Sequence, residues 1–260
     1  FNHLLQMFKG FQDVKGLDFV FLNRPKDLFF EIREKLFSER FDSVAGAIQA
    51  YTEYLVEKWV INLMEQTQIR RLCYAGGVAM NVKANMVISQ IPNLEGLFVP
   101  PCPDDTSQCI GAVYQYLLEQ KSPQLGLPIR SPYLGRDATV DGHLTKPSPS
   151  EIRTNLSLSE NYEVIEKSHL SVAAQEISDG KVLGVIWGRE EFGARALGNR
   201  SIVANPADSS IKKRINEMIK DRDFWMPFAA SILERVADDY LKLEQHSSTY
   251  AYMTNACTST

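Results

Sequence analysis

Three arginines lie within twelve residues in the stretch GREEFGARALGNRS, residues 188–201. They are Arg189, Arg195 and Arg200, and they alternate with glycines and two adjacent glutamates. Glycine lets the backbone approach a ligand closely, and the arginine guanidinium binds phosphate or carboxylate oxygens in pairs. Because the first arginine ends a predicted strand and the last opens the next one, we expect the three side chains to converge on one cleft. The stretch therefore predicts an anion site, in preference to exposed surface arginines beside a pair of glutamates that starts a helix.

The positive charge of the chain is concentrated around this stretch. Residues 188–222 hold eight Lys and Arg against five Asp and Glu, a local charge of +3, whereas the whole chain carries −4. The anion site is expected to extend to Lys220 and Arg222. A nucleic-acid-binding domain usually has a net basic face, so the acidic balance argues against nucleic acid as the partner.

A second candidate site is AGGVAMNVKAN, residues 75–85. Gly76 and Gly77 follow a predicted strand and precede a predicted helix, where exposed N–H groups suit a phosphate or a ribose. Asn81 and Asn85 are four residues apart and are expected on one face of the first helical turns. A plain turn that needs glycine for its backbone angles explains the two glycines equally well.

A third candidate is PPCPDDTSQCIGA, residues 100–112. Asp104 and Asp105 lie between a predicted strand and a predicted helix, where a carboxylate caps the helix or binds a hard cation. Local evidence favours the cap, although one carboxylate can cap while its neighbour binds a metal. The four histidines are scattered, so no complete metal site can be recognised.

Alternating strands and helices predict an α/β fold. Before residue 121 the hydrophobic pattern predicts helices over 26–66, 81–90 and 108–120 and strands over 70–77 and 94–101. Asp42 or Ser43 is the expected N-cap of the main part of the first helix. Residues 121–143 are rich in Pro and Gly and predict a linker, packed through Tyr133 and Leu134. Beyond it we expect helix over 151–156, strand over 162–167, helix over 169–180, strands over 181–188 and 200–206, and helices over 209–222 and 227–241.

Composition narrows the class of protein. The chain has 260 residues, 44% of them hydrophobic, which suits one large or two modest globular domains. No apolar run approaches the ~18 residues of a membrane span, and the first residues do not have the pattern of a signal peptide. The four cysteines show no metal or disulfide spacing, so we expect reduced, mostly buried thiols in a cytoplasmic protein.

These stretches together resemble the O-carbamoyltransferases of the NodU/CmcH family. The resemblance is most specific in GREEFGARALGNRSIVANP and continues through NEMIKDRDFWMPFAASILE. AGGVAMNVKAN, FVPPCPDDTSQCIGAVY and SPYLG resemble further blocks of that family in the expected order. The resemblance covers the chain from about residue 40 onward.

The resemblance implies a fold made of two parts. Residues 1–125 are expected to form the second lobe of an actin-like (ASKHA) domain that binds ATP and a metal. Residues 126–148 are expected to be a linker, and residues 149–260 an α/β domain like threonylcarbamoyl-AMP synthase, cut short at its end. The family's first lobe, with its metal-binding histidines, has no counterpart in residues 1–40, and the chain lacks an initiator Met, so we expect a fragment.

The resemblance also implies a reaction. The C-terminal domain activates carbamoyl phosphate with ATP to give carbamoyl adenylate, and the actin-like domain passes the carbamoyl group to a hydroxyl of a small-molecule acceptor near a divalent metal, iron or magnesium. It assigns the activation site to Arg189, Arg195, Arg200, Ser201, Lys220 and Arg222. It assigns nucleotide contacts to Gly76, Gly77 and Asn81, with Asn85 one helical turn further on, and the metal to Asp105. No membrane partner is expected, and a homodimer is a candidate assembly.

The sequence departs from the family pattern at four positions: Ser107, Ala194, Met226 and Ala230 stand where Gly, Pro, Arg and Pro are expected. Met226 removes one charge from the edge of the activation site. Two other functions stay open. A threonylcarbamoyl-type enzyme acting on tRNA predicts a basic surface, and a non-catalytic nucleotide-binding module predicts ATP binding that ignores carbamoyl phosphate.

Overall fold

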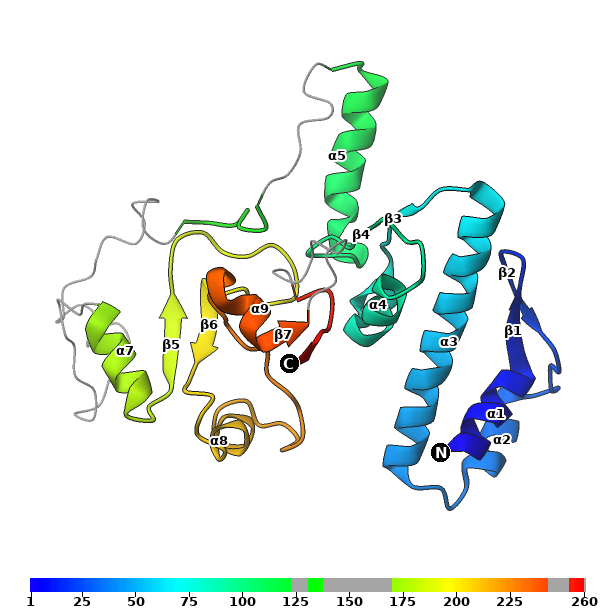
Figure 1. Cartoon of the computed structure of the whole chain (residues 1–260), viewed down its shortest axis with the longest axis horizontal. Coiled ribbons are helices and arrows are strands. Elements are labelled where there is room, and N and C mark those ends of the chain that lie inside the picture. The colour runs from blue at the N-terminus through cyan, green and yellow to red at the C-terminus, as the bar shows by residue number, and fades with distance from the viewer. Residues whose placement is uncertain (123–130, 138–169, 243–252, 260) are drawn as a thin grey trace. The chain divides into compact units, whose positions relative to one another are not determined.

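The computed structural model describes residues 1–122, 131–137, 170–242 and 253–259 (Figure 1). The chain forms two compact units, the first from residues 1–122 and 235–260 and the second from 123–234. The helix expected over 151–156 and the strand over 162–167 lie outside the described residues. The domain boundaries drawn from the sequence at residues 125 and 148 stay predictions.

The first unit begins with a helix and a hairpin that were not expected from the sequence. Helix α1 (Asn2–Phe11) leads into β1 (Gln12–Lys15) and β2 (Asp18–Phe21), which pair antiparallel. Leu4 and Phe8 of α1 are buried against Ala47, so the helix gains its stability from apolar packing. The carboxylate of Asp13 in β1 accepts hydrogen bonds from Tyr54 and Lys58 of the long helix α3 (Phe41–Thr67), and these bonds hold the hairpin to that helix.

The helix expected over residues 26–66 is two helices. Helix α2 spans Leu28–Leu36 and α3 spans Phe41–Thr67, and between them Ser38 has a φ of 70°, which a right-handed helix cannot include. The expected N-cap is wrong. The helix starts one residue before Asp42, whose carboxylate binds the Arg40 guanidinium at 2.7 and 3.0 Å instead of capping the first turn.

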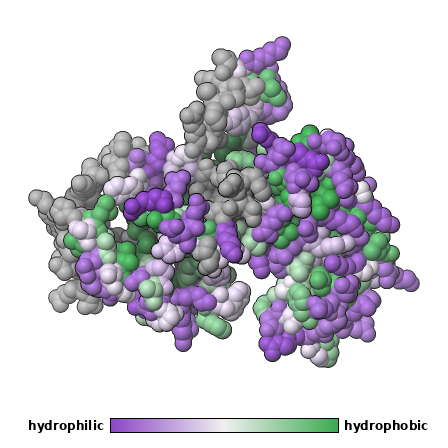
Figure 2. Space-filling model, viewed as in Figure 1, coloured by the Kyte–Doolittle hydropathy of each residue, from purple (hydrophilic) through white to green (hydrophobic). Residues whose placement is uncertain are grey.

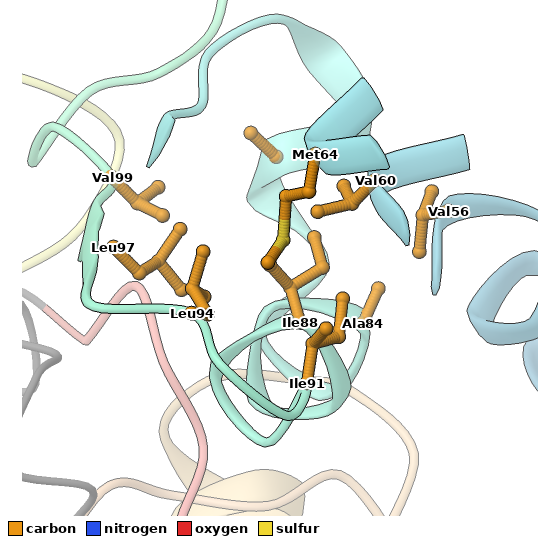
Figure 3. Close-up of a cluster of buried hydrophobic side chains, with 10 residues drawn as sticks. Val56, Val60, Met64, Ala84, Ile88, Ile91, Leu94, Leu97 and Val99 are labelled. Atoms are coloured by element: carbon orange, nitrogen blue, oxygen red, sulfur yellow. The ribbon is translucent and has the colours of Figure 1, made fainter. Parts of the chain in front are cut away.

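The core of the first unit lies in a β-α-β arrangement. Strands β3 (Arg71–Cys73) and β4 (Gly96–Phe98) are parallel, and helix α4 (Val82–Ser89) connects them. Figure 3 shows that buried side chains of α3, α4 and β4 point toward one another, among them Val60, Ile88 and Leu97. This cluster fixes α4 against α3, and so fixes the loops at both ends of α4. Helix α5 (Gln108–Glu119) follows β4.

Several aromatic side chains of the first unit stay at the surface. Helix α2 buries no residue, and Phe29, Phe30, Phe37 and Phe41 are each more than 60% exposed. In Figure 2 the part of the molecule that holds α1 to α4 shows hydrophobic residues among hydrophilic ones. None of the helices within the described ranges is both long and apolar enough to cross a membrane.

The second unit contains α7 (Leu170–Ser178), the antiparallel strands β5 (Leu183–Ile186) and β6 (Arg200–Val203), and α8 (Ile211–Met218), as the sequence predicted in type and order. The helix expected over 227–241 is wrong over most of its length. Only a 3₁₀ turn (η3, Glu234–Val236) and α9 (Ala237–Tyr240) form, and α9 falls in the first unit, where β7 (Leu241–Lys242) then pairs with β8 (Thr258–Ser259).

All four cysteines are free thiols, in agreement with the sequence. The expectation that they are mostly buried is wrong, because Cys102 is buried whereas Cys73 and Cys109 are exposed. Cys73 lies in β3, whose sheet has two strands within the described residues, so little structure lies beside the strand to cover this side chain.

Candidate functional site

The first candidate region is the glycine turn, residues 75–81, which follows β3. Gly76 has a φ of +107°, a conformation that a side chain would strain, and its N–H donates to the carbonyl of Pro103 at 2.7 Å. The bond joins this turn to the aspartate loop, residues 101–107, which follows β4. Both loops therefore lie at the carboxyl edge of one parallel sheet, where α/β proteins bind ligands.

The space beside the glycine turn is open. A Cβ built on Gly76 or on Gly77 meets no heavy atom within 4 Å, so packing does not explain why glycine stands there. Among the described residues, the backbone of this turn is therefore open to the approach of a ligand.

Asn81 shapes the turn through its side chain. Its Oδ1 accepts from the N–H of Ala84, which makes it the N-cap of α4, and it forms a reciprocal amide pair with Gln49 of α3 at 3.0 and 3.1 Å. Gln49 in turn donates to Glu53. Both ends of the Asn81 amide are thus engaged by the protein, which leaves it the role of orienting the loop.

Asn85 lies one helical turn further on and is completely buried. Its Nδ2 donates to the carbonyl of Ala79 at 2.7 Å and to that of Thr254 at 2.6 Å. Its Oδ1 is buried without a hydrogen-bond partner among the described residues. Asn81 and Asn85 were expected to project from one face toward a ligand, and the structure places both side chains inside the framework of the turn.

The aspartate loop separates its two carboxylates. Asp104 caps a 3₁₀ turn (η2, Asp105–Ser107) by accepting from Thr106, and the hydrogen bonds from the Thr106 hydroxyl and the Cys102 thiol hold its pKa below the ordinary value. Asp105 is exposed, and one of its oxygens accepts from Gln108 at 3.1 Å. This is the division expected from the sequence, with one carboxylate capping and its neighbour available.

Asp105 does not belong to a multi-residue metal site within the described residues. These residues hold no group of three His, Cys, Asp or Glu side chains arranged to bind a metal. Magnesium is often held by one or two carboxylates together with waters and substrate phosphates. Asp105 is exposed and available to supply one such carboxylate, at the sheet edge where the glycine turn also lies.

The second candidate region is the arginine loop, residues 188–201, between β5 and β6. Its backbone folds around the carboxylate of Glu191, whose Oε1 accepts from the N–H groups of Leu197, Asn199 and Arg200 at 2.7 to 3.1 Å. Burial raises the pKa of Glu191, but the backbone hydrogen bonds prevail and hold it below the ordinary value. The carboxylate of Glu191 is therefore the internal anion that shapes the loop backbone.

The three arginines differ in how firmly the protein holds them. Arg200 donates to the carbonyls of Trp187, Gly188 and Asn199, and its Nε lies 3.7 Å from Glu190. Arg189 is exposed and makes a long contact, 3.4 Å, with a backbone carbonyl. Arg195 is half-buried near the tip of the loop. Arg200 therefore braces the loop, and Arg189 presents its guanidinium to solvent.

The segment 131–137, part of the expected linker, packs against the arginine loop. The N–H of Gly135 donates to the carbonyl of Glu190 at 3.0 Å, the N–H of Phe192 donates to the carbonyl of Pro132 at 2.7 Å, and the Tyr133 hydroxyl donates to the carbonyl of Leu197 at 2.8 Å. The sequence anticipated the packing of Tyr133 but not that Gly135 is needed for it. A Cβ on Gly135 comes within 2.6 Å of the Glu190 Cβ.

The remaining expected residues divide between two loops. Ser201 is the second residue of β6, and its hydroxyl accepts from the N–H of Gly198 inside the arginine loop. Lys220 and Arg222 lie in the loop after α8, where Lys220 is exposed. Arg222 donates to Asn216 at 2.6 Å and lies over the ring of Phe228 at 4.5 Å. The side chains of Ser201 and Arg222 are thus used to hold loop structure.

Asn216 organises the loop after α8 and was not singled out from the sequence. It is completely buried, its Nδ2 donates to the carbonyls of Phe224 and Met226, and its Oδ1 accepts from Arg222. These bonds hold residues 222–226 in an irregular path directly before Pro227, where the expected helix does not start. An asparagine within a helical pattern gives no sign that it will be buried in this way.

Replacing this residue tests its role. Asn216→Ala removes the buried amide that binds the carbonyls of Phe224 and Met226 and the Arg222 Nε–H, and we expect a loss of about 2 kcal/mol in the free energy of unfolding. Urea unfolding of the full chain measures it. Lys212→Ala, an exposed position on the same helix, is expected to change stability by less than about 0.5 kcal/mol. Equal stability of the two variants would contradict the proposed role of Asn216.

Comparison with known proteins agrees with this geometry. Residues 14–114 match the family model described as carbamoyltransferase N-terminus, and residues 174–260 match the one described as carbamoyltransferase C-terminus. The glycine turn and the aspartate loop lie in the first match, and the arginine loop lies in the second.

Several relatives are about a third identical to the chain over the residues that align. Nodulation protein NolNO of Sinorhizobium fredii is 32% identical over 230 residues, which cover 86% of this chain and 32% of the relative. Nodulation protein NolO of Bradyrhizobium diazoefficiens is 31% identical over 218 residues, 84% of this chain and 38% of the relative. Nodulation protein U of Azorhizobium caulinodans is 31% identical over 212 residues, 77% of this chain and 34% of the relative.

The chain thus spans roughly a third of the length of these relatives. The two family matches occur in N- to C-terminal order and together cover most of its residues. The chain therefore belongs to the carbamoyltransferase family.

Proposed function

We propose that the chain carries out, as part of an ATP-dependent O-carbamoyltransferase, the activation of carbamoyl phosphate and the transfer of its carbamoyl group to a hydroxyl of a small molecule. The observation that carries the proposal is the arginine loop, whose backbone is preorganised around Glu191 while Arg189 stays exposed. Preorganised cations offset the repulsion between two phosphate-bearing substrates without rearranging during the reaction.

The proposed reaction has two steps, the activation of carbamoyl phosphate and the transfer of the carbamoyl group. Water converts carbamoyl phosphate to carbamate and inorganic phosphate, and a carbamate oxygen then attacks the α-phosphorus of ATP and displaces pyrophosphate. The acceptor hydroxyl oxygen attacks the carbamoyl carbon of the resulting adenylate, AMP leaves, and the hydroxyl proton passes to solvent. Arg189, Arg195 and Lys220 are proposed to bind the phosphates in the first step, and Arg200, Ser201 and Arg222 to hold the loops that present them.

The first unit is proposed to bind a nucleotide at the glycine turn. Gly76 and Gly77 leave the backbone open to a phosphate, and Asn81 and Asn85 hold the turn in shape. A divalent cation held by Asp105, for which magnesium fits better than iron, would neutralise phosphate charge there. We propose a cytoplasmic location, since carbamoyl phosphate and ATP are cytoplasmic metabolites.

A pair of arginine variants tests the proposal. Arg189→Ala is expected to raise the KM for carbamoyl phosphate tenfold or more while the unfolding curve stays the same, because the charge it removes is exposed and makes a long contact with the loop. Arg200→Ala is expected to reduce both activity and stability, because three carbonyls lose their donor. Lys212→Ala is the matched control for charge. An unchanged KM in Arg189→Ala would remove this residue from the anion site.

A further inference from the structure

The C-terminal segment, residues 253–259, is built into the unit that holds the glycine turn. The family match places this segment with the arginine loop, in residues 174–260, whereas its contacts place it in the first unit. Thr254 is 1% exposed and Asn255 7%, so the segment is covered by protein rather than resting on the surface.

Three hydrogen bonds fix the segment to the carboxyl edge of the parallel sheet. The carbonyl of Thr254 accepts from Asn85 at 2.6 Å, and its hydroxyl donates to the carbonyl of Val99 at 3.4 Å, just beyond β4. The N–H of Ala256 donates to the carbonyl of Val82, the first residue of α4, at 3.1 Å. The segment therefore contacts both ends of the loop-helix-strand element that carries the glycine turn.

Asn85 links the two parts through one amide group. The same Nδ2 donates to Thr254 and to Ala79, which lies within the 3₁₀ turn (η1, Gly77–Met80) of the glycine turn. Because both bonds share one nitrogen on a completely buried side chain, a displacement of the segment must be accommodated by Asn85 or by the turn. Removing the segment would also leave a buried amide hydrogen without an acceptor, which is unfavourable.

We infer that residues 253–257 are a positioning element of the nucleotide site, and that Asn85 is the positioning residue through which they act. The inference rests on the proposed binding of ATP at the glycine turn. The affinity for ATP then depends on the C-terminal segment, and by linkage bound ATP must stabilise the segment by the same factor.

A substitution at Ala256 tests the link in the free protein. Ala256→Pro removes the N–H that donates to Val82, whereas Ala256→Gly keeps it and serves as the matched control. In the full chain, amide hydrogen exchange over residues 77–85 is expected to accelerate about tenfold in the proline variant and to stay within twofold in the glycine variant. Unchanged exchange in the proline variant would contradict the link. Thr254→Val, which removes only the hydroxyl donor, is expected to give a smaller change in the same direction.

Titration with MgATP tests the reciprocal effect. MgATP is expected to slow exchange over 77–85 and over 253–257 together, and Ala256→Pro is expected to raise the Kd for MgATP about tenfold without shifting the global unfolding midpoint. Protection of 77–85 without protection of 253–257 would overturn the inference. If MgATP protects neither segment, the proposed nucleotide site fails, and the exchange of the two Ala256 variants in the free protein still decides whether the segment positions the turn.

Discussion

Glu191→Ala is expected to abolish carbamoyl-phosphate-dependent activity and to lower the free energy of unfolding by about 4 kcal/mol. The carboxylate accepts three backbone N–H groups from residues 197–200, and hydrogen bonds to a charged group contribute about 1.5 to 3 kcal/mol each, though not additively. Without it the loop has no anion around which to close, so Arg189 and Arg195 lose their fixed positions. Urea unfolding measures the loss of stability, amide exchange at Leu197 and Asn199 measures the loss of loop order, and pyrophosphate release measures the activity.

Two further variants separate charge from shape. Glu191→Gln keeps a neutral oxygen acceptor and is expected to lose about half as much stability. Glu190→Gln removes a neighbouring exposed carboxylate whose ion pair with Arg200 is 3.7 Å long, and it is expected to change stability by less than about 0.5 kcal/mol. If Glu190→Gln were as damaging as Glu191→Gln, the loss would reflect the overall charge of the loop rather than the hydrogen bonds of Glu191.

The stabilising effect of Glu191 depends on pH in a definite direction. Its pKa in the folded chain lies below the ordinary value of 4.5, so the unfolded chain binds its proton first as the pH falls. The contribution is fully present above pH 4.5 and is lost as the pH drops through the folded-state pKa. The difference in stability between the natural chain and Glu191→Gln is therefore expected to shrink below pH 4.5 and to stay constant above it.

Gly135→Ala is expected to remove activity and to cost about 3 kcal/mol, since overpacking a close contact typically costs about 1–3 kcal/mol and sometimes more. A Cβ at this position comes within 2.6 Å of the Glu190 Cβ and 3.1 Å of the Glu190 carbonyl oxygen. Both atoms belong to the rigid part of the arginine loop, so segment 131–137 must move away and its hydrogen bonds to the loop must break.

Gly184→Ala is the matched control for this variant. Gly184 lies in β5 of the same unit, and a Cβ there meets no heavy atom within 4 Å. The control is expected to fold and react like the natural chain, because alanine suits a strand at least as well as glycine. A Gly135→Ala chain with unchanged unfolding and unchanged KM would show that segment 131–137 is not needed to hold the loop.

The sequence predicted the parts of this molecule that depend on local pattern. The strand, glycine turn and helix at residues 70–90 and the strand, loop and strand at 181–206 formed as expected, because apolar runs interrupted by glycine specify such transitions. The position of the two aspartates before a helix favoured a capping role, and Asp104 caps the turn there. The family assignment followed from the arginine loop, whose letters are unusual enough to identify it.

The parts that sequence reasoning missed depend on contacts between distant residues. The buried amides of Asn85 and Asn216 bind carbonyls that only the folded chain brings within reach, and the partner of Asn85 lies 169 residues away. The helix expected over 227–241 forms only over Glu234–Tyr240, and the backbone just before it is bound by Asn216 through the carbonyls of Phe224 and Met226. A helix-like spacing in a sequence carries no information about buried side-chain hydrogen bonds of this kind.

Pyrophosphate release from ATP by the full chain, with and without carbamoyl phosphate, tests the proposed activation step most directly. We expect release that requires carbamoyl phosphate, yields AMP once a hydroxyl acceptor is supplied, and falls at least tenfold in Glu191→Ala. Release of pyrophosphate or phosphate from ATP at the same rate without carbamoyl phosphate, or binding of ATP with no effect of carbamoyl phosphate, would contradict the proposed function and leave a nucleotide-binding module.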